Sequence, residues 1–201
     1  MNPAEFSTLV RGLELLLDRM YQWAKRAREE HGAPSDGVAT HMLDLATDDL
    51  HQFVTLLLDC LQPIELAPTP TPIGDLIASL VQHARVDLRA ASVTVSGDVR
   101  GTVAADPVHL PRAWPGILRR LGLQAVGRAL FVKVDTAGEG VKIDLTFGDA
   151  VRPSTTHEPT AEVEWMLARR IVRLHGGDVR KDTRQHVVSV LLPADLQAGG
   201  T

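Results

Sequence analysis

The sequence predicts an α+β protein: an N-terminal helical hairpin that forms a dimeric four-helix bundle, followed by an α/β sandwich. Three observations predict this fold class. Apolar residues recur at three- and four-residue steps through most of the first 61 residues, a proline-rich stretch follows at 67–72, and helix and strand patterns alternate from residue 73 onward. The first pattern predicts long amphipathic helices, and the last predicts a sheet covered by helices.

The first helix is predicted to begin at the N-terminus. Asn2 can cap it, and Pro3 suits the first helical position because its missing N–H is not needed there. Apolar side chains then follow one helical stripe from Phe6 to Ala24. The glycine- and proline-containing segment 32–37 is expected to break the helix and to turn the chain.

Helical spacing resumes from Met42 to Leu61, so residues 1–66 are predicted to form a helical hairpin domain. Two helices of this length cannot bury both apolar stripes against one another alone. We therefore expect a homodimer that closes a four-helix bundle. The predicted dimer interface combines apolar positions of both helices: Leu13, Leu16, Leu17, Met20, Leu50, Phe53 and Leu57. Three polar positions on the first helix are predicted to dock a protein partner: Glu14, Asp18 and Arg19.

Residues 67–72 alternate proline with alanine or threonine and are predicted to be an extended linker. Proline fixes its own torsion and moves the preceding residue toward extended geometry. The second domain is then expected to span residues 73–201. Its predicted elements, in order, are helix 73–90, strands 92–96 and 101–104, helix 107–125, strands 129–135 and 141–147, helix 161–174, and strands 178–182 and 185–192. Short hairpin connections indicate a mixed or antiparallel sheet with helices on one face.

The composition is that of a soluble folded chain. It has 201 residues, of which 44% are hydrophobic and 23% charged, with a formal net charge of −4. Without clustered cations, neither nucleic acid nor a membrane surface is expected as a partner. Cys60 is the only cysteine, which excludes an intrachain disulfide and fits a reducing compartment. The N-terminus has no basic start followed by an apolar core, so we expect a cytoplasmic protein.

Several strings in the second domain resemble the core of sensor histidine kinases. The run 167–177 and the closing strand 189–193 are similar to the last helix and C-terminal strand of that family. Residues 72–77 resemble its entry helix, and 106–110 resemble the lead into its magnesium-binding helix. The resemblance covers nearly the whole chain. It implies a dimerisation and phosphotransfer hairpin followed by an ATPase domain of the Bergerat type.

The nucleotide-binding positions that the resemblance implies are changed. Arg120 stands where the family has a magnesium-binding asparagine, and an arginine cannot ligate Mg²⁺. Phe147 replaces the aspartate that recognises adenine; Asp149 replaces a glycine, or takes over the aspartate's role in a shifted register. Glu162 and Glu164 match the glycine motif beneath the phosphates, where carboxylates would repel the ligand. We therefore expect no ATP, no metal ion and no other cofactor.

The family's phosphoacceptor histidine also has no counterpart, because leucines occupy the matching stretch of the first helix. His41 and His51 on the second helix are substitute candidates, since a neutral, exposed imidazole is what phosphoryl acceptance requires. Ordinary exposed side chains are the simpler interpretation of both. His175, before Gly176 and Gly177, is expected to cap the last helix as a cation.

The retained architecture and changed chemistry predict a pseudo-histidine-kinase. This would be a non-catalytic, dimeric scaffold that binds a response-regulator receiver domain or another signalling protein in two-component-type signalling. The competing prediction is an enzyme, an ATP-independent histidine phosphotransferase that relays phosphoryl groups between receiver domains. A third prediction is a regulator that binds a different ligand in the vacated pocket, although Phe147 favours a filled cavity there.

Overall fold

The computed structural model describes residues 3–29, 38–87, 90, 92–121, 128–137, 140–148, 159–182 and 186–194. The chain divides into two compact units. The first consists of Met1–Gln62 with His157–Val163, and the second consists of Pro63–Thr156 with Glu164–Thr201.

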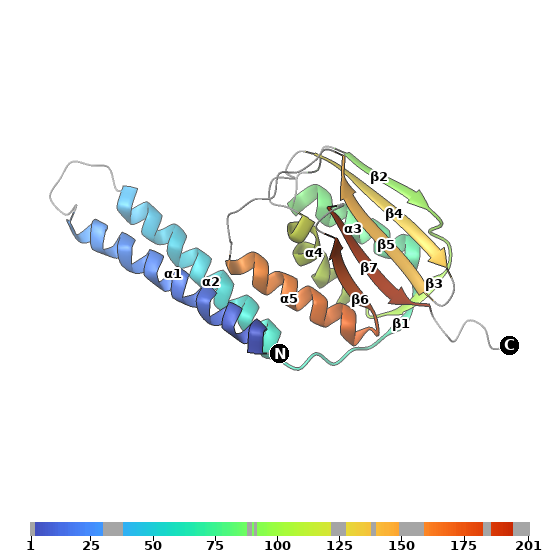
Figure 1. The fold of residues 1–201 in the computed structure, drawn as a ribbon, viewed down its shortest axis with the longest axis horizontal. Helices are drawn as coiled ribbons and strands as arrows, with labels where there is room; N and C mark the ends of the chain where they lie inside the picture. Colours follow the sequence, from blue (N-terminus) through green and yellow to red (C-terminus); the bar gives the residue numbers. More distant parts are fainter. Residues whose placement is uncertain are drawn as a thin grey trace. The chain divides into compact units, whose positions relative to one another are not determined.

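The first unit contains the predicted hairpin, with α1 (Pro3–Glu29) and α2 (Val38–Leu61) packed side by side (Figure 1). Its buried apolar residues recur every seven positions: Leu9 and Leu16 on α1, and Ala39, Ala46 and Phe53 on α2. A seven-residue repeat keeps one row of each helix against its neighbour along the whole pair. These residues form the seam of the hairpin.

The second unit is built on a mixed sheet whose strand order in the described residues is β2-β4-β5-β7-β6. The strands are β2 (Ser92–Gly97), β4 (Ala129–Ala137), β5 (Gly140–Phe147), β6 (Asp178–Asp182) and β7 (Val187–Pro193). β2 runs parallel to β4, and the other neighbours are antiparallel. The predicted mixed sheet is therefore confirmed.

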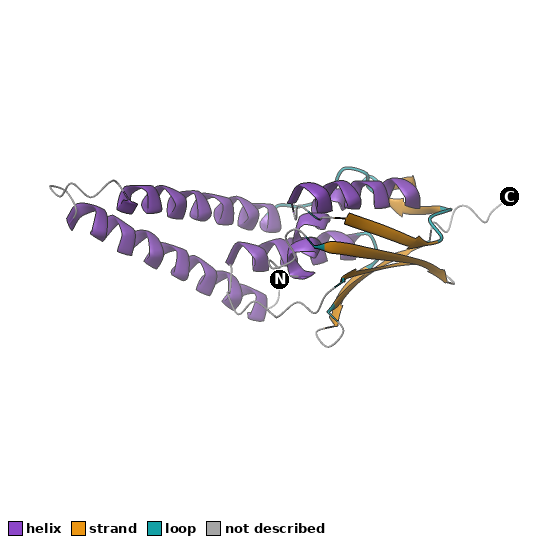
Figure 2. Cartoon of the chain, turned by 90° about the horizontal axis from the view of Figure 1, so that it is seen from above, coloured by secondary structure: helices purple, strands orange, loops and turns teal. Residues whose placement is uncertain are grey.

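Helices cover one face of this sheet (Figure 2). They are α3 (Ile73–Asp87), α4 (Trp114–Leu121), preceded by the 3-10 turn η1 (Leu110–Ala113), and α5 (Pro159–Leu174), which begins in the first unit and continues in the second. In β7, Val188, Val190 and Leu192 are buried, whereas the residues between them are partly exposed. Because side chains alternate along a strand, one face of the sheet packs on helices and the other faces solvent.

Two predicted elements differ from the structure. Residues Thr69–Pro72, predicted as an extended linker, form β1 and pair antiparallel with β3 (Thr102–Ala105). Oγ1 of Thr71 donates a hydrogen bond to the carbonyl of Ala105 at 3.2 Å. The linker prediction missed this pairing because the partner strand lies 34 residues away in sequence. The helix predicted at 107–125 begins as η1 and continues as α4 from Trp114 to Leu121, and its predicted end at 125 lies outside the described residues.

Candidate functional site

One side of the α1–α2 hairpin carries a broad apolar surface, which we call the hairpin face. It consists of exposed and half-buried side chains of both helices: Phe6, Val10, Leu13, Leu17 and Tyr21 on α1, and Leu43, Leu50, Val54, Leu57, Leu58 and Leu61 on α2. Arg19 of α1 pairs with Asp49 of α2 at 3.2 Å. Helical spacing puts this ion pair on one side of the seam and both apolar rows on the other.

The predicted dimer interface divides between the hairpin face and the seam. Five of the predicted residues lie on or beside the hairpin face: Leu13, Leu17, Met20, Leu50 and Leu57. The other two, Leu16 and Phe53, are 1% and 0% exposed and are already buried within the chain. A second copy of the chain would therefore meet the first five rather than these two.

The predicted docking residues and histidines lie outside the seam, and Glu14 and His51 border the hairpin face, one turn from Leu17 and Val54 respectively. Glu14 and Asp18 are exposed on α1, while Arg19 is engaged with Asp49. His41 and His51 are exposed on α2, and within the described ranges neither ring is paired with a carboxylate. Exposure therefore agrees with the prediction for both histidines, but no carboxylate in those ranges orients either imidazole.

In the second unit, residues at the changed nucleotide positions contact other parts of the protein. Cζ of Arg120 lies 5.5 Å from the centroid of the Trp165 ring, within range of a cation–π interaction. Nε of Arg119 lies 3.2 Å from Oε2 of Glu164, a residue that is 8% exposed. Nζ of Lys181 donates to the carbonyl oxygen of Arg120 at 2.9 Å. We call this set of interactions the α4–α5 contact.

The backbones of α4 and α5 touch beside these pairs. A Cβ added at Gly116 would lie 2.3 Å from the carbonyl oxygen of Glu164 and 3.2 Å from Cβ of Ala168. Only glycine permits so close an approach. Glu164, predicted to repel phosphate, is instead compensated by the guanidinium of Arg119.

The other three changed nucleotide positions, Phe147, Glu162 and Asp149, do not belong to the α4–α5 contact. Phe147 lies at the end of β5 opposite Leu130 and is half-buried. Glu162 lies on α5, in the part that belongs to the first unit. Asp149 lies outside the described residues, so both interpretations of its role stay predictions.

A buried carboxylate, Asp106, joins the segment before β1 to the turn before α4. Oδ1 accepts the backbone N–H groups of Val108 and His109 at 2.8 and 2.9 Å. Oδ2 accepts the backbone N–H of Ala67 at 2.8 Å and lies 3.0 Å from Nδ1 of His109. Burial alone would raise the pKa of Asp106, but these hydrogen bonds together outweigh it and hold that pKa well below its usual range.

The prediction that His175 caps α5 as a cation is wrong in its charge state. Nδ1 of His175 lies 2.8 Å from the carbonyl oxygen of Ile171, and Nε2 accepts the backbone N–H of Asp106 at 3.0 Å. A nitrogen that accepts a hydrogen bond carries no proton, so the buried ring is neutral, with its proton on Nδ1. The left-handed turn predicted after it is confirmed, because Gly176 has a φ of 74°.

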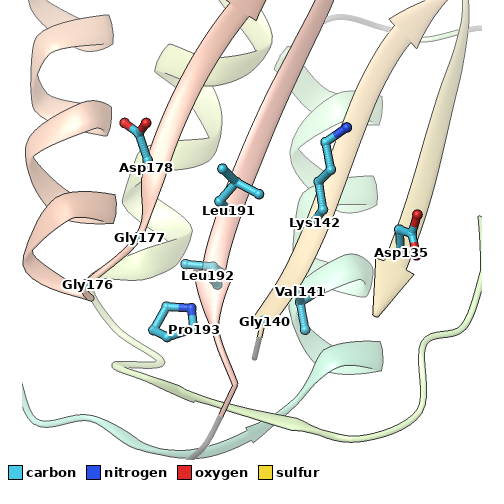
Figure 3. A pocket seen from close by; sticks show the side chains of 10 residues that line it. All are labelled: Asp135, Gly140, Val141, Lys142, Gly176, Gly177, Asp178, Leu191, Leu192 and Pro193. Atoms are coloured by element: carbon cyan, nitrogen blue, oxygen red, sulfur yellow. The ribbon is translucent and has the colours of Figure 1, made fainter. Parts of the chain in front are cut away.

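The open face of the sheet holds a shallow pocket of about 510 Å³ (Figure 3). Its lining residues come from β4, β5, β7, the start of β6 and the turn before it: Asp135, Gly140, Val141, Lys142, Gly176, Gly177, Asp178, Leu191, Leu192 and Pro193. Lys142 is paired with Asp144 at 2.8 Å, and Asp178 with Arg180 at 2.8 Å. Since surface neighbours already satisfy these charges, we assign no ligand to this pocket.

Among the described residues, no group of three or more His, Cys, Asp or Glu side chains is placed to hold a metal ion. No helix in those ranges is both long enough and apolar enough to cross a membrane.

His109 was not singled out from the sequence as a functional residue. The available signal was local: an aspartate that starts a helical turn is followed three residues later by a side chain able to bond back to it, as in a capping box. The structure adds that Asp106 is buried and that His109 is partly exposed.

No protein-family model and no curated protein matches the chain. Solved structures do match. The histidine kinase AdeS of Acinetobacter baumannii is 11% identical with a TM-score of 0.62, over 91% of this chain and 97% of that one. The histidine kinase ThkA, solved in complex with the response regulator TrrA, is 12% identical with a TM-score of 0.69, over 96% of this chain and 62% of that one. The nucleotide-free catalytic domain of ThkA aligns with 64% of this chain at a TM-score of 0.50.

Proposed function

Because the chain has the fold of a histidine kinase core, from the helical hairpin through the catalytic ATPase-like domain, we propose that it is a scaffold in two-component-type signalling. The scaffold is a non-catalytic homodimer that does not bind ATP and that binds a response-regulator receiver domain or another signalling protein. The α4–α5 contact is the observation that carries this proposal.

The α4–α5 contact argues against nucleotide binding. Mg²⁺ held against a triphosphate needs oxygen ligands, and Arg120 has none in its side chain. The guanidinium of Arg120 is stacked on Trp165, and Arg119 forms an ion pair with the buried carboxylate of Glu164. Two of the side chains at the nucleotide positions, Arg120 and Glu164, are therefore already used to hold α4 and α5 together.

The hairpin face supports a homodimer. Phe6, Leu17 and Leu58 are 55%, 49% and 52% exposed, so the surface is apolar over both helices and unpartnered within a single hairpin. Monomeric proteins rarely expose a contiguous apolar surface this long. A second copy carries the same face and can cover it about a twofold axis, which gives a four-helix bundle.

The partner class is proposed by analogy with ThkA, a histidine kinase solved in complex with its response regulator. Glu14 and Asp18 are exposed on α1, beside the hairpin face, where they would meet a partner at the edge of the covered surface. They are therefore proposed to contact the receiver domain.

Light scattering on the chain alone and mixed with receiver domains of co-occurring response regulators tests the proposal. The expected result is a dimer that takes up receiver domains, with uptake lost in a Glu14→Lys, Asp18→Lys variant that stays dimeric. A matched control places the same two charge reversals at Asp44 and Asp48 on α2, where uptake should persist. A monomeric chain, or a dimer that takes up no receiver domain, would refute it.

The histidine phosphotransferase remains the second candidate, because His41 and His51 are exposed on α2 and His109 is held by the buried carboxylate of Asp106. Incubation with a phosphorylated receiver domain tests it. Acid-labile phosphate on the chain, passed on to a second receiver domain, supports the relay. Loss of that phosphate in the His41→Ala or His51→Ala variant would assign the acceptor to α2.

A further inference from the structure

We propose that His109 is a phosphoacceptor whose Nε2 takes a phosphoryl group from an acyl phosphate, with Asp106 as the positioning residue. The inference goes beyond a purely scaffolding role, since it gives the chain a covalent modification site that needs no ATP. It rests on the proposed function only for the biological source of the acyl phosphate, an aspartyl phosphate on a receiver domain.

The geometry of the pair fixes which nitrogen can react. Nδ1 of His109 lies 3.0 Å from Oδ2 of Asp106. The same carboxylate accepts backbone N–H groups from Ala67, Val108 and His109, so it is ionised and can only accept. Nδ1 must therefore carry the proton in the neutral ring, which leaves the lone pair on Nε2.

The two side chains differ in exposure in the way that a nucleophile and its orienting group require. The side chain of Asp106 is 4% exposed and that of His109 is 23% exposed. Within the described part of the chain, Nε2 of His109 has no hydrogen-bond partner and is not among the buried unsatisfied atoms. The ring is thus held at Nδ1 from inside and reaches solvent at Nε2.

Three other histidines, His175, His41 and His51, lack this combination. His175 uses both ring nitrogens, one toward Ile171 and one toward Asp106. His41 and His51 are exposed, but no carboxylate among the described residues holds either ring. An oriented neutral imidazole with a free nitrogen is the form that attacks an electrophile.

The chemical step balances without a further reactant. The Nε2 lone pair forms the N–P bond, and the P–O bond to the acyl oxygen breaks, with its electrons leaving on the carboxylate. The proton stays on Nδ1, so the phosphorylated ring is cationic and faces Asp106. The ionised carboxylate compensates that charge. The depressed pKa of Asp106 supports this role, because the carboxylate stays charged at neutral pH.

The test incubates the full chain with acetyl phosphate, a small acyl phosphate, and in a second arm with a phosphorylated receiver domain. The expected product is one acid-labile phosphoryl group, located on Nε2 of His109 by mass spectrometry and nuclear magnetic resonance, and absent from the His109→Gln variant. The substituted side chain retains an amide donor that can reach Asp106, so this variant is designed to keep the turn intact. Circular dichroism checks its fold.

The role of Asp106 is tested separately with Asp106→Asn. Labelling should slow roughly 10- to 100-fold, the range typical of losing a carboxylate that orients a histidine. The ¹⁵N shifts of the ring should also show that the proton is no longer confined to Nδ1. A purely structural role would leave that proton distribution unchanged in the folded variant.

The outcomes separate this inference from the proposed function. Labelling of His109 by acetyl phosphate alone, without receiver uptake, supports the inference and counts against the receiver partner. Labelling in both arms supports both. A folded dimer that binds receiver domains but carries no phosphate on His109 in either arm, or carries it on His41 or His51, overturns the inference and leaves the scaffold standing.

Discussion

Replacing Gly116 by alanine should loosen the α4–α5 contact. The added Cβ would lie 2.3 Å from the carbonyl oxygen of Glu164 and 2.6 Å from its carbonyl carbon, and neither backbone atom can move without shifting α5. Overpacking of this kind costs about 1–3 kcal/mol or more, and the better helix propensity of alanine returns at most about 1 kcal/mol. We expect a net loss of about 2 kcal/mol of unfolding free energy, which for a chain of this length lowers Tm by roughly 4–8 °C.

The matched control is Gly74→Ala in α3. Its Cβ would have only the carbonyl oxygen of Val99 within reach, at 3.9 Å, so the substitution should leave Tm unchanged or raise it. Thermal unfolding followed by circular dichroism compares the two variants. If Gly116→Ala were as stable as Gly74→Ala, α4 and α5 would not touch as described, and the argument that their contact replaces a nucleotide site would fail.

Three further predictions follow from single contacts. Leu17→Asp, on the hairpin face, should give a folded monomer by light scattering, whereas Leu16→Asp in the seam should unfold the hairpin; a dimeric Leu17→Asp protein would exclude this face as the interface. The pKa of Asp106 is lower in the folded than in the unfolded chain, so the carboxylate stabilises the folded state fully above about pH 4–5 and less as the pH falls below that. Urea unfolding at a series of pH values should show the free energy of unfolding decline with falling pH in the wild type, and decline less in Asp106→Asn. Arg119→Ala should cost about 1–3 kcal/mol, because it removes an ion pair from the buried carboxylate of Glu164; a urea unfolding midpoint equal to that of the wild type would show that the pair contributes nothing.

The elements that sequence reasoning predicted well are those set by local patterns. Alternation of apolar residues in 187–193 and the hairpin between β4 and β5 needed no information from distant residues. The predicted interface residues were not separated from the seam, because the seam and the hairpin face share the same helical periodicity. The seven-residue spacing of Leu9 and Leu16, matched by Ala39, Ala46 and Phe53, was the signal that separates the two.

The features that the sequence could not give are contacts between distant residues. His175 meets the backbone of Asp106 across 69 positions, and this contact decides that its ring is neutral. The pairing of Arg119 with Glu164 likewise reverses what an isolated carboxylate at that position implies. The sequence shows which residues can carry a charge, whereas burial and neighbouring groups determine whether each is charged and what it pairs with.

Thermal unfolding of the chain with and without saturating Mg-ATP shows whether the second unit binds nucleotide. A ligand present at about 100 times its Kd adds about 3 kcal/mol to the unfolding free energy, which raises Tm by roughly 6–12 °C for a chain of this length. We expect Tm to be the same with ATP, with ADP and without nucleotide, because Arg119 forms an ion pair with Glu164 and Arg120 stacks on Trp165. A nucleotide-dependent rise of several degrees would contradict this expectation and would restore a kinase function to the fold.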